Sequence, residues 1–130
     1  MDPAVADALA IDAGSDARER TVDITTVGRR SGEARRIETW FHRVDGAVYL
    51  SGTPGPRGWA ANLEAEPGFT FHLKNGVTAD LPAHATQIVD EAQRRLIFTA
   101  LLDALAGVSD VSRNLDEWVA GSPLFAVDFD

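Results

Sequence analysis

Residues 20–51, RTVDITTVGRRSGEARRIETWFHRVDGAVYLS, decide the fold of this chain. After Arg20 the side chains alternate, with Val22, Ile24 and Thr26 on one face and Thr21, Asp23 and Thr25 on the other. Such alternation is typical of a strand with one buried face. The segment from Gly28 to Gly32 predicts a turn, because the glycine at either end can adopt a positive φ angle. A second strand is predicted at about 35–44, where aromatic and β-branched side chains are frequent.

Hairpin signals continue along the rest of the chain. Asp45-Gly46 predicts a tight turn into a third strand over residues 47–51. Asn75-Gly76 predicts another turn, between a strand at 69–74 and a long, partly broken strand at 77–89. Residues 124–129 predict a sixth strand. Six strands joined mainly by hairpins predict a small antiparallel barrel, so the fold class is mainly β with α-helical decoration.

Helices are predicted in three places outside the strands. The loop 52–58 holds two prolines and three glycines, so it predicts irregular structure before a short helix at 59–66 that Pro67 ends. A longer helix is predicted from Asp90 to about Ala106, with a buried face of Leu96, Ile97, Ala100, Leu101, Ala104 and Leu105. A last helix is predicted at 111–120, capped by Ser109 or Asp110.

A length of 130 residues predicts one domain with one core. Residues 1–19 are expected to form an N-terminal arm or a short helix, with Pro3 at a first helical position. Residues 20–130 are expected to form the barrel domain. The first residues carry acids where a signal peptide carries bases, and no stretch is apolar enough to cross a membrane. These features predict a cytoplasmic protein with no integral membrane segment.

Charge and cysteine content exclude several classes of site. With no cysteine, the chain has no disulfide, thiolate nucleophile or cysteine-bound metal. A formal net charge of −8 disfavours a nucleic-acid partner, because a polyanion is repelled by most of the surface. Residues 26–63 nevertheless carry a balance of +3, against −11 for the rest of the chain. A local anion site is predicted there, although an arginine-rich composition also follows from codon bias.

Two motifs in this region resemble the deazaflavin-dependent nitroreductase family, which belongs to the flavin/deazaflavin superfamily of split β-barrels. The motifs are Thr25-Thr-Val-Gly-Arg-Arg-Ser-Gly-Glu-Ala-Arg35 with Trp40-Phe41, and Ser51-Gly-Thr-Pro-Gly-Pro-Arg-Gly-Trp59 with Asn62-Leu63 and Pro67. The resemblance covers roughly residues 20–89. It departs from the family pattern in two places: Ser51-Gly-Thr-Pro-Gly replaces Ser-Lys-Gly-Gly, and Glu38 or Thr39 stands where many members have proline.

The resemblance implies a split barrel that binds the deazaflavin coenzyme F-420 and passes hydride to a quinone, a nitro compound or another conjugated acceptor. The cofactor-binding residues that it implies are Arg29, Arg30, Ser31, Gly32, Arg35, Ser51, Gly52, Thr53, Gly55, Arg57, Trp59 and Asn62. FMN in the same barrel is one alternative, and a non-catalytic binder of a flavin or tetrapyrrole is another. A homodimer is expected because exposed barrel edges need cover.

Each part of this implied site also has a purely structural interpretation. The arginines of the turn supply bidentate donors for a phosphate, or they are ordinary solvated side chains. The 52–58 loop brings N–H groups to a planar ring and Arg57 to an acidic tail, or it only connects a strand to a helix. Trp59 stacks near the cofactor or lies in the core, and Asn62 bonds either the ligand or the hairpin.

No catalytic acid, base or metal site is predicted. His42, His72 and His84 lie on different predicted strands and lack metal-ligand spacing. No motif places a serine for acyl transfer. Because a deazaflavin carries the redox chemistry itself, replacing any one histidine is expected to change turnover by less than about a hundredfold.

Overall fold

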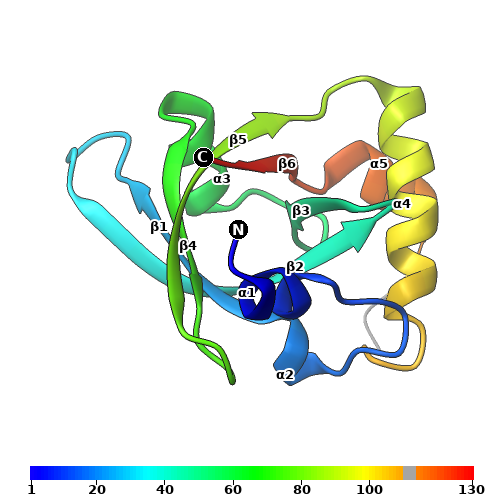
Figure 1. Cartoon of the computed structure of the whole chain (residues 1–130). Helices are drawn as coiled ribbons and strands as arrows, with labels where there is room; N and C mark the ends of the chain where they lie inside the picture. Colours follow the sequence, from blue (N-terminus) through cyan, green and yellow to red (C-terminus); the bar gives the residue numbers. More distant parts are fainter. Residues whose placement is uncertain (110–113) are drawn as a thin grey trace.

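The computed structural model describes residues 1–109 and 114–130 and contains a closed antiparallel barrel (Figure 1). Its strands follow the order β1-β2-β3-β6-β5-β4 around the barrel. They are β1 Thr21–Val27, β2 Ala34–Val44, β3 Ala47–Ser51, β4 Gly68–Leu73, β5 Ala79–Gln87 and β6 Leu124–Phe129. The predicted fold class is therefore confirmed, and only the fifth strand is shorter than predicted.

The β1–β2 hairpin has the predicted alternation, since Val22, Ile24 and Thr26 are buried. Its turn uses its two glycines differently from the prediction. Gly32 has a φ of 71°, but Gly28 has no positive φ. Gly28 fits for another reason: a Cβ at this position would lie 2.5 Å from Ser31 Oγ and 3.3 Å from Glu33 O, so a side chain there would force the turn to shift.

The two halves of β2 have different neighbours. Its residues 34–40 pair with β1, whereas its residues 41–44 pair with β3. Among the described residues, the edge of 34–40 that faces away from β1 has no strand partner. This hairpin extends from the barrel in Figure 1. The argument that a dimer covers open edges applies to this part of β2, and the homodimer stays a prediction.

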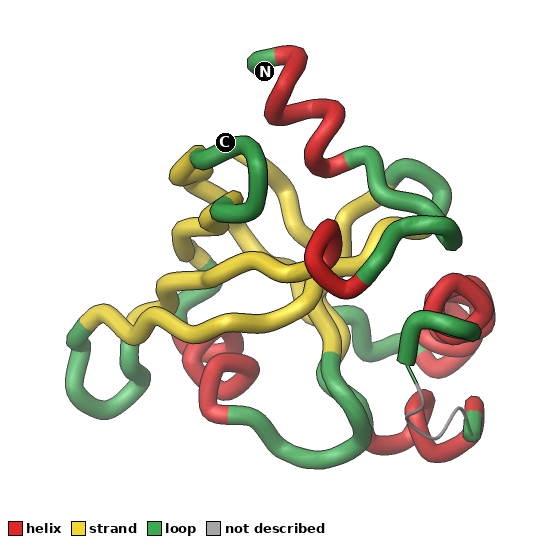
Figure 2. Tube along the Cα trace, turned by 90° about the horizontal axis from the view of Figure 1, so that it is seen from below, coloured by secondary structure: helices red, strands yellow, loops and turns green. Residues whose placement is uncertain are grey.

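The helices lie around the outside of the strands (Figure 2). They are α1 Pro3–Leu9, α2 Ala17–Arg20, α3 Gly58–Ala65, α4 Glu91–Leu105 and α5 Leu115–Gly121. As predicted, α3 ends before Pro67. The helix predicted from Asp90 is α4, and Asp90 is its N-cap, with a side chain that accepts from Gln93 N. The predicted cap of α5 is wrong, because Asn114 accepts the bond from Glu117 N. Asp110 and Val111, where that prediction began, lie outside the described residues.

The predicted buried face of α4 is wrong in part. Ile97, Leu101 and Leu105 are buried as predicted, but Leu96 is 75% exposed and Ala100 is also exposed. Phe98 and Leu102 are buried in their place. The physical reason is that α4 packs against α5 as well as the barrel, with Phe98 edge-on to Trp118.

The N-terminal segment is tied to the barrel by a buried arginine. Pro3 begins α1, and Val5 and Leu9 pack into the barrel core. The guanidinium of Arg20, 1% exposed, donates to the carbonyls of Asp12 at 2.6 Å, Ser15 at 3.1 Å and Ala104 at 3.4 Å. These bonds attach the segment before β1 to the end of α4. The division at residue 20 between arm and barrel domain stays a prediction.

Two apolar clusters form the core. One fills the barrel, with Phe41, Phe71 and Phe125 among its members. The other lies between α4, α5 and the outer wall of the barrel, where Trp40 and Tyr49 pack against it. Since side chains fill the barrel, ligand pockets lie on its outside. Within the described residues, no helix is long and apolar enough to cross a membrane.

Candidate functional site

A pocket of about 350 Å³ lies between the Gly28–Gly32 turn, the first half of β2 and the start of α3. We call it the hairpin pocket; it is lined by Thr26, Gly28, Arg29, Arg30, Ser31, Arg35, Ile37, Gly58, Trp59 and Asn62. Half of the twelve predicted site residues meet here. The hairpin and α3 are therefore brought together as the resemblance implied.

Asn62 connects the two sides of the hairpin pocket. Its Oδ1 accepts a hydrogen bond from Arg29 N at 3.0 Å, and its Nδ2 donates to Thr26 Oγ1 at 3.1 Å. The side chain is buried, so the bonds hold the turn against α3. Of the two predicted roles for Asn62, bonding the hairpin is the one that the structure contains.

The chemistry of the hairpin pocket suits an anion beside a flat apolar group. Arg29, Arg30 and Arg35 border it. Among the described residues, the only ion pair that these arginines form is a long one, 3.6 Å, between Arg35 and exposed Glu33. The first turn of α3 has no side-chain cap and reaches the pocket at Gly58. Uncapped N–H groups and the helix dipole favour negative charge. Ile37 and Trp59 supply the apolar surface.

A second pocket, of about 270 Å³, lies between the middle of β2, the end of β3 and the late helices. We call it the tryptophan pocket; its lining is Thr39, Trp40, His42, Ser51, Gly52, Thr53, Leu105, Ser109 and Trp118. Three more predicted residues lie here, and Ser51 Oγ donates to Pro123 O at 2.6 Å. Ile37 lines one pocket and Thr39 the other, about 7 Å apart along one strand. The two pockets are therefore neighbours along β2.

The last three predicted residues lie elsewhere. Arg57 donates to Thr53 O at 2.9 Å, Thr53 Oγ1 at 2.6 Å and Pro56 O at 3.1 Å, so it braces its own loop. Gly55 N donates to Gly121 O at 3.0 Å, which takes this N–H away from a ring. Arg57 and Gly55 line a third pocket, between α3 and α5, and Gly32 lines none of the three.

Replacing Gly55 with valine is expected to destabilise the protein by about 1–3 kcal/mol. Gly55 has a φ of 129°, and a Cβ there would lie 3.3 Å from Arg57 Nη1. The strain thus falls on the loop that forms one wall of the tryptophan pocket. Urea denaturation measures the loss. Gly58→Ala is the matched control, because Gly58 has open space and no positive φ; equal stability of the two variants contradicts the argument.

His42 is the residue of the site that sequence reasoning missed. It is 5% exposed, lines the tryptophan pocket, and its Nδ1 has no hydrogen-bond partner in the part of the chain that the structure describes. Burial, helped by the nearby charge of Arg20, lowers the pKa of His42 to about 3. The alternation that placed Trp40 and His42 on the same face of β2 was the available signal. The alternation alone did not indicate a pocket, because the pocket on that face exists only where α4 and α5 cover it.

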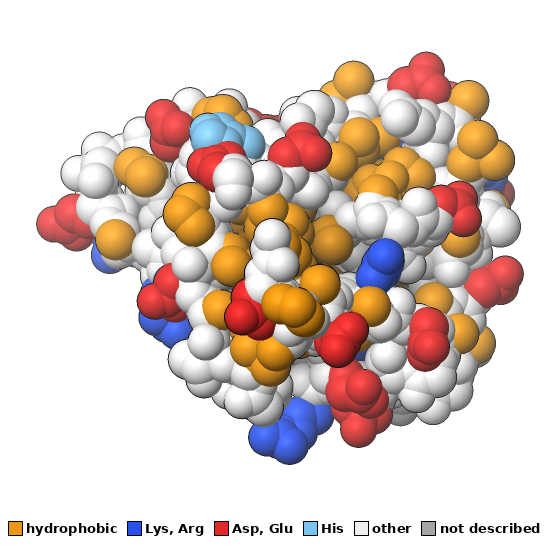
Figure 3. Space-filling model, in the orientation of Figure 1, with side chains coloured by type: hydrophobic (Ala, Val, Ile, Leu, Met, Phe, Trp, Pro, Cys, Tyr) orange, Lys and Arg blue, Asp and Glu red, His pale blue; other side chains and the backbone are white. Residues whose placement is uncertain are grey.

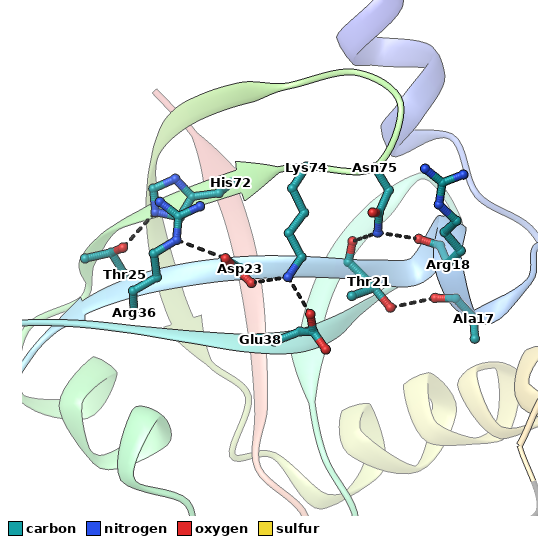
Figure 4. Close-up of polar contacts among 10 residues, drawn as sticks. All are labelled: Ala17, Arg18, Thr21, Asp23, Thr25, Arg36, Glu38, His72, Lys74 and Asn75. Carbon is teal, nitrogen blue, oxygen red and sulfur yellow. Dashed lines mark hydrogen bonds and ion pairs between the residues drawn. The ribbon is translucent and has the colours of Figure 1, made fainter.

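The other two histidines have partners. His72 Nε2 lies 2.7 Å from Thr25 Oγ1, as Figure 4 shows. Its Nδ1 lies 2.6 Å from Asp80 Oδ1, a residue that the figure does not label. His84 pairs with Asp130 at 2.7 Å. His72 therefore belongs to a polar network on the outer face of β1, β2 and β4, and both differ from His42 in being satisfied within the fold.

Protein stability is expected to fall by about 2 kcal/mol between pH 8 and pH 5 through His42 alone. With a folded pKa of about 3 the ring stays neutral, whereas in the unfolded chain it takes up a proton below about pH 6.5. The unfolded state thus binds more protons, and acid favours it. His42→Gln is expected to remove this component of the slope, and His84→Gln to keep it. Urea titrations at each pH measure it; the same slope in the His42 variant contradicts the assignment.

The surface charges of the molecule set the hairpin pocket apart. Acidic side chains are spread over the face shown in Figure 3. On the outer face of β1, β2 and β4, Lys74 bonds both Asp23 and Glu38, and Arg36 donates to Asp23 at 2.9 Å (Figure 4). The bond from Lys74 is the main reason that the pKa of Asp23 lies below its ordinary value. The basic groups of this network are paired with acids, whereas Arg29 and Arg30 of the hairpin pocket form no ion pair with a described residue.

Comparison with known proteins gives a family. The model of the F420H(2)-dependent quinone reductase family matches residues 13–115, which confirms the resemblance that the motifs carried. No curated protein matches the chain.

Solved structures share the fold. A conserved hypothetical protein of Mycobacterium tuberculosis superposes with a TM-score of 0.68 at 19% identity, over 99% of this chain and 81% of that one. An F420-H2 dependent reductase, FDR-A, gives 0.55 at 18% identity, over 84% and 94%. A heme binding protein from Mycobacterium smegmatis gives 0.66 at 14% identity, over 100% and 53%. The barrel alone therefore does not select the ligand.

Proposed function

Because this chain belongs to the F420H(2)-dependent quinone reductase family, it is an oxidoreductase with coenzyme F-420 as its cofactor, and we propose that it passes hydride to a quinone. The observation that carries the proposal is the order of features along β2. Arg35 stands at the cationic end, Ile37 follows in the hairpin pocket, and Trp40 lies in the tryptophan pocket. This order gives successive places for an anionic tail, a planar ring and an acceptor.

The hairpin pocket supplies the groups that a phosphorylated, acidic cofactor needs. Arg29, Arg30 and Arg35 offer guanidinium donors, which form charge-assisted bonds with phosphate and carboxylate. The start of α3 offers N–H groups at Gly58 and Trp59. Trp59 is half-buried against Phe125, with ring centroids 5.9 Å apart, so its indole is held in place beside the pocket. We assign cofactor binding to these residues.

The tryptophan pocket is the place for the acceptor. Trp40 and Trp118 supply apolar walls, and Ser51, Gly52 and Thr53, from the end of β3 and the loop before α3, form another wall. The reduced coenzyme supplies a hydride, and water supplies the proton that completes the hydroquinone. The protein's share is to hold ring and acceptor next to each other and to exclude water between them. No protein acid or base is required for that.

The test is a titration of the purified protein with coenzyme F-420 and with FMN. F-420 is expected to bind at least about tenfold more tightly at low salt, because three arginines exceed the needs of a single phosphate. Fluorescence quenching of each cofactor measures the affinity. Oxidation of reduced F-420 is then followed with menadione and with a nitroaromatic compound. Tighter binding of FMN favours that alternative, and binding of heme without any turnover favours a carrier.

A further inference from the structure

The tryptophan pocket contains a buried polar group that the fold leaves unsatisfied. His42 lines this pocket, and its Nδ1 is shielded from solvent and has no hydrogen-bond partner among the described residues. Trp40, Leu105 and Trp118 supply the apolar part of the pocket lining, and hydroxyl side chains of Thr39, Ser51, Thr53 and Ser109 complete it. A leucine of similar size would satisfy this environment at no polar cost, since a buried polar group without a partner lowers stability. Packing alone therefore does not account for a histidine here.

His42 also differs from a general acid. Its ring is neutral in the folded protein, because burial and the charge of Arg20 oppose protonation. Arg20 itself donates to the carbonyls of Asp12, Ser15 and Ala104, so its charge is held in place near His42. A neutral imidazole offers one donor and one acceptor. It suits a hydrogen bond with an uncharged ligand better than with an anion, whose charge would also be costly to bury.

We propose that His42 is the specificity-determining residue of the tryptophan pocket, where its imidazole hydrogen-bonds a planar, uncharged carbonyl acceptor. The inference rests on the proposed function for the identity of the acceptor. It adds to that function a residue and a class of substrate: apolar quinones held between Trp40 and Trp118, with one oxygen on His42. The histidine binds and orients, and it takes no part in proton transfer.

The experiment begins with coenzyme-free protein, so that binding is read without turnover. Menadione is titrated into the ¹⁵N-labelled protein, and the imidazole nitrogen resonances of the three histidines are followed. His42 is expected to shift with saturation, while His84, which is exposed and paired with Asp130, stays constant. Saturation without a shift of His42 overturns the proposal.

Two substitutions separate hydrogen bonding from packing. His42→Leu is expected to weaken menadione binding and raise its KM by about tenfold, with a smaller change in kcat. His42→Asn keeps a polar atom near the position of Nδ1 and is expected to restore most of the affinity. Menadione affinity close to that of the wild type in the leucine variant overturns the proposal, whether or not the asparagine variant also binds.

Two controls keep the readings apart. Affinity for coenzyme F-420 is expected to be the same in wild type and both variants, because His42 does not line the hairpin pocket. Thermal unfolding shows whether each variant is folded; if the leucine variant is not, the asparagine variant and the resonance shifts still decide. If the wild type does not bind F-420, the proposed function is wrong. If F-420 binds but menadione neither shifts the His42 resonances nor loses affinity in the leucine variant, only this inference is wrong.

Discussion

Replacing Arg29 and Arg30 together with alanine is expected to weaken coenzyme F-420 binding at least about a hundredfold, because each charge-assisted contact contributes about 1.5–3 kcal/mol. Both side chains are exposed on the turn and border the hairpin pocket. Neither side chain forms a hydrogen bond or ion pair with another described residue, so the fold is expected to survive. Fluorescence titration measures the affinity, and thermal unfolding confirms the folded state.

Salt and a matched variant test whether the loss is local. Added salt is expected to weaken wild-type binding more than binding to the double variant, since exposed charges are screened. Arg95→Ala removes one positive charge from α4, far along the chain from the turn, where Arg95 pairs with Asp116 and Glu91. It is expected to leave the affinity unchanged. If the double variant has the same dissociation constant for F-420 as the wild type, the hairpin is not part of the cofactor site.

Replacing Arg94 with alanine is expected to cost about 3 kcal/mol or more of unfolding free energy. Its guanidinium donates to Ile88 O and Val119 O, each at 2.9 Å, and to Ser122 O at 2.5 Å. It also lies 5.3 Å from the ring centre of Phe98. The side chain thus caps the C-terminal end of α5 and ties it to the segment before α4. Chemical denaturation measures the loss.

The Arg94 variant also has a functional consequence. Trp118 lies on α5, so loosening this helix is expected to enlarge the tryptophan pocket and raise the KM for menadione more than the dissociation constant of F-420. Arg94→Lys keeps the charge but not the planar fork, and it is expected to recover about half of the stability. Arg95→Ala is the neighbouring control. It removes only exposed ion pairs, so it is expected to lower the unfolding free energy by about 0–1 kcal/mol. Equal stability of the Arg94 and Arg95 alanine variants contradicts this role.

Much of the candidate site could be predicted from short segments of the sequence. The strand alternation at Val22 and Ile24 and the turn at Asp45-Gly46 depend on residues next to each other, so the sequence predicted them correctly. The motif around Arg29 and Arg30 and the helix that carries Asn62 were predicted to form one site. The bond from Arg29 N to Asn62 joins them in the structure. Hairpin connections bring such neighbours together with little choice of arrangement.

The roles of residues that depend on partners in other elements, or on the fold of their own loop, could not be predicted in this way. Arg57 seemed available to a cofactor, but Thr53 and Pro56 engage it within its own loop. The helical period of α4 identified Ile97 and Leu101, yet it could not say that α5 would draw Phe98 inward. Periodicity gives the faces of a helix, and only the elements packed around that helix decide which of them is covered.

By itself, then, the sequence determined the six strands, the barrel class and the cationic turn, because alternation, turn chemistry and charge are properties of short segments. The tertiary structure alone decided that two pockets adjoin each other along β2. It also decided that His42 is neutral and that its Nδ1 has no hydrogen-bond partner within residues 1–109 and 114–130. Both features arise where β2, the end of β3 and the late helices meet, and burial there is a property of the assembled fold, which no single segment contains.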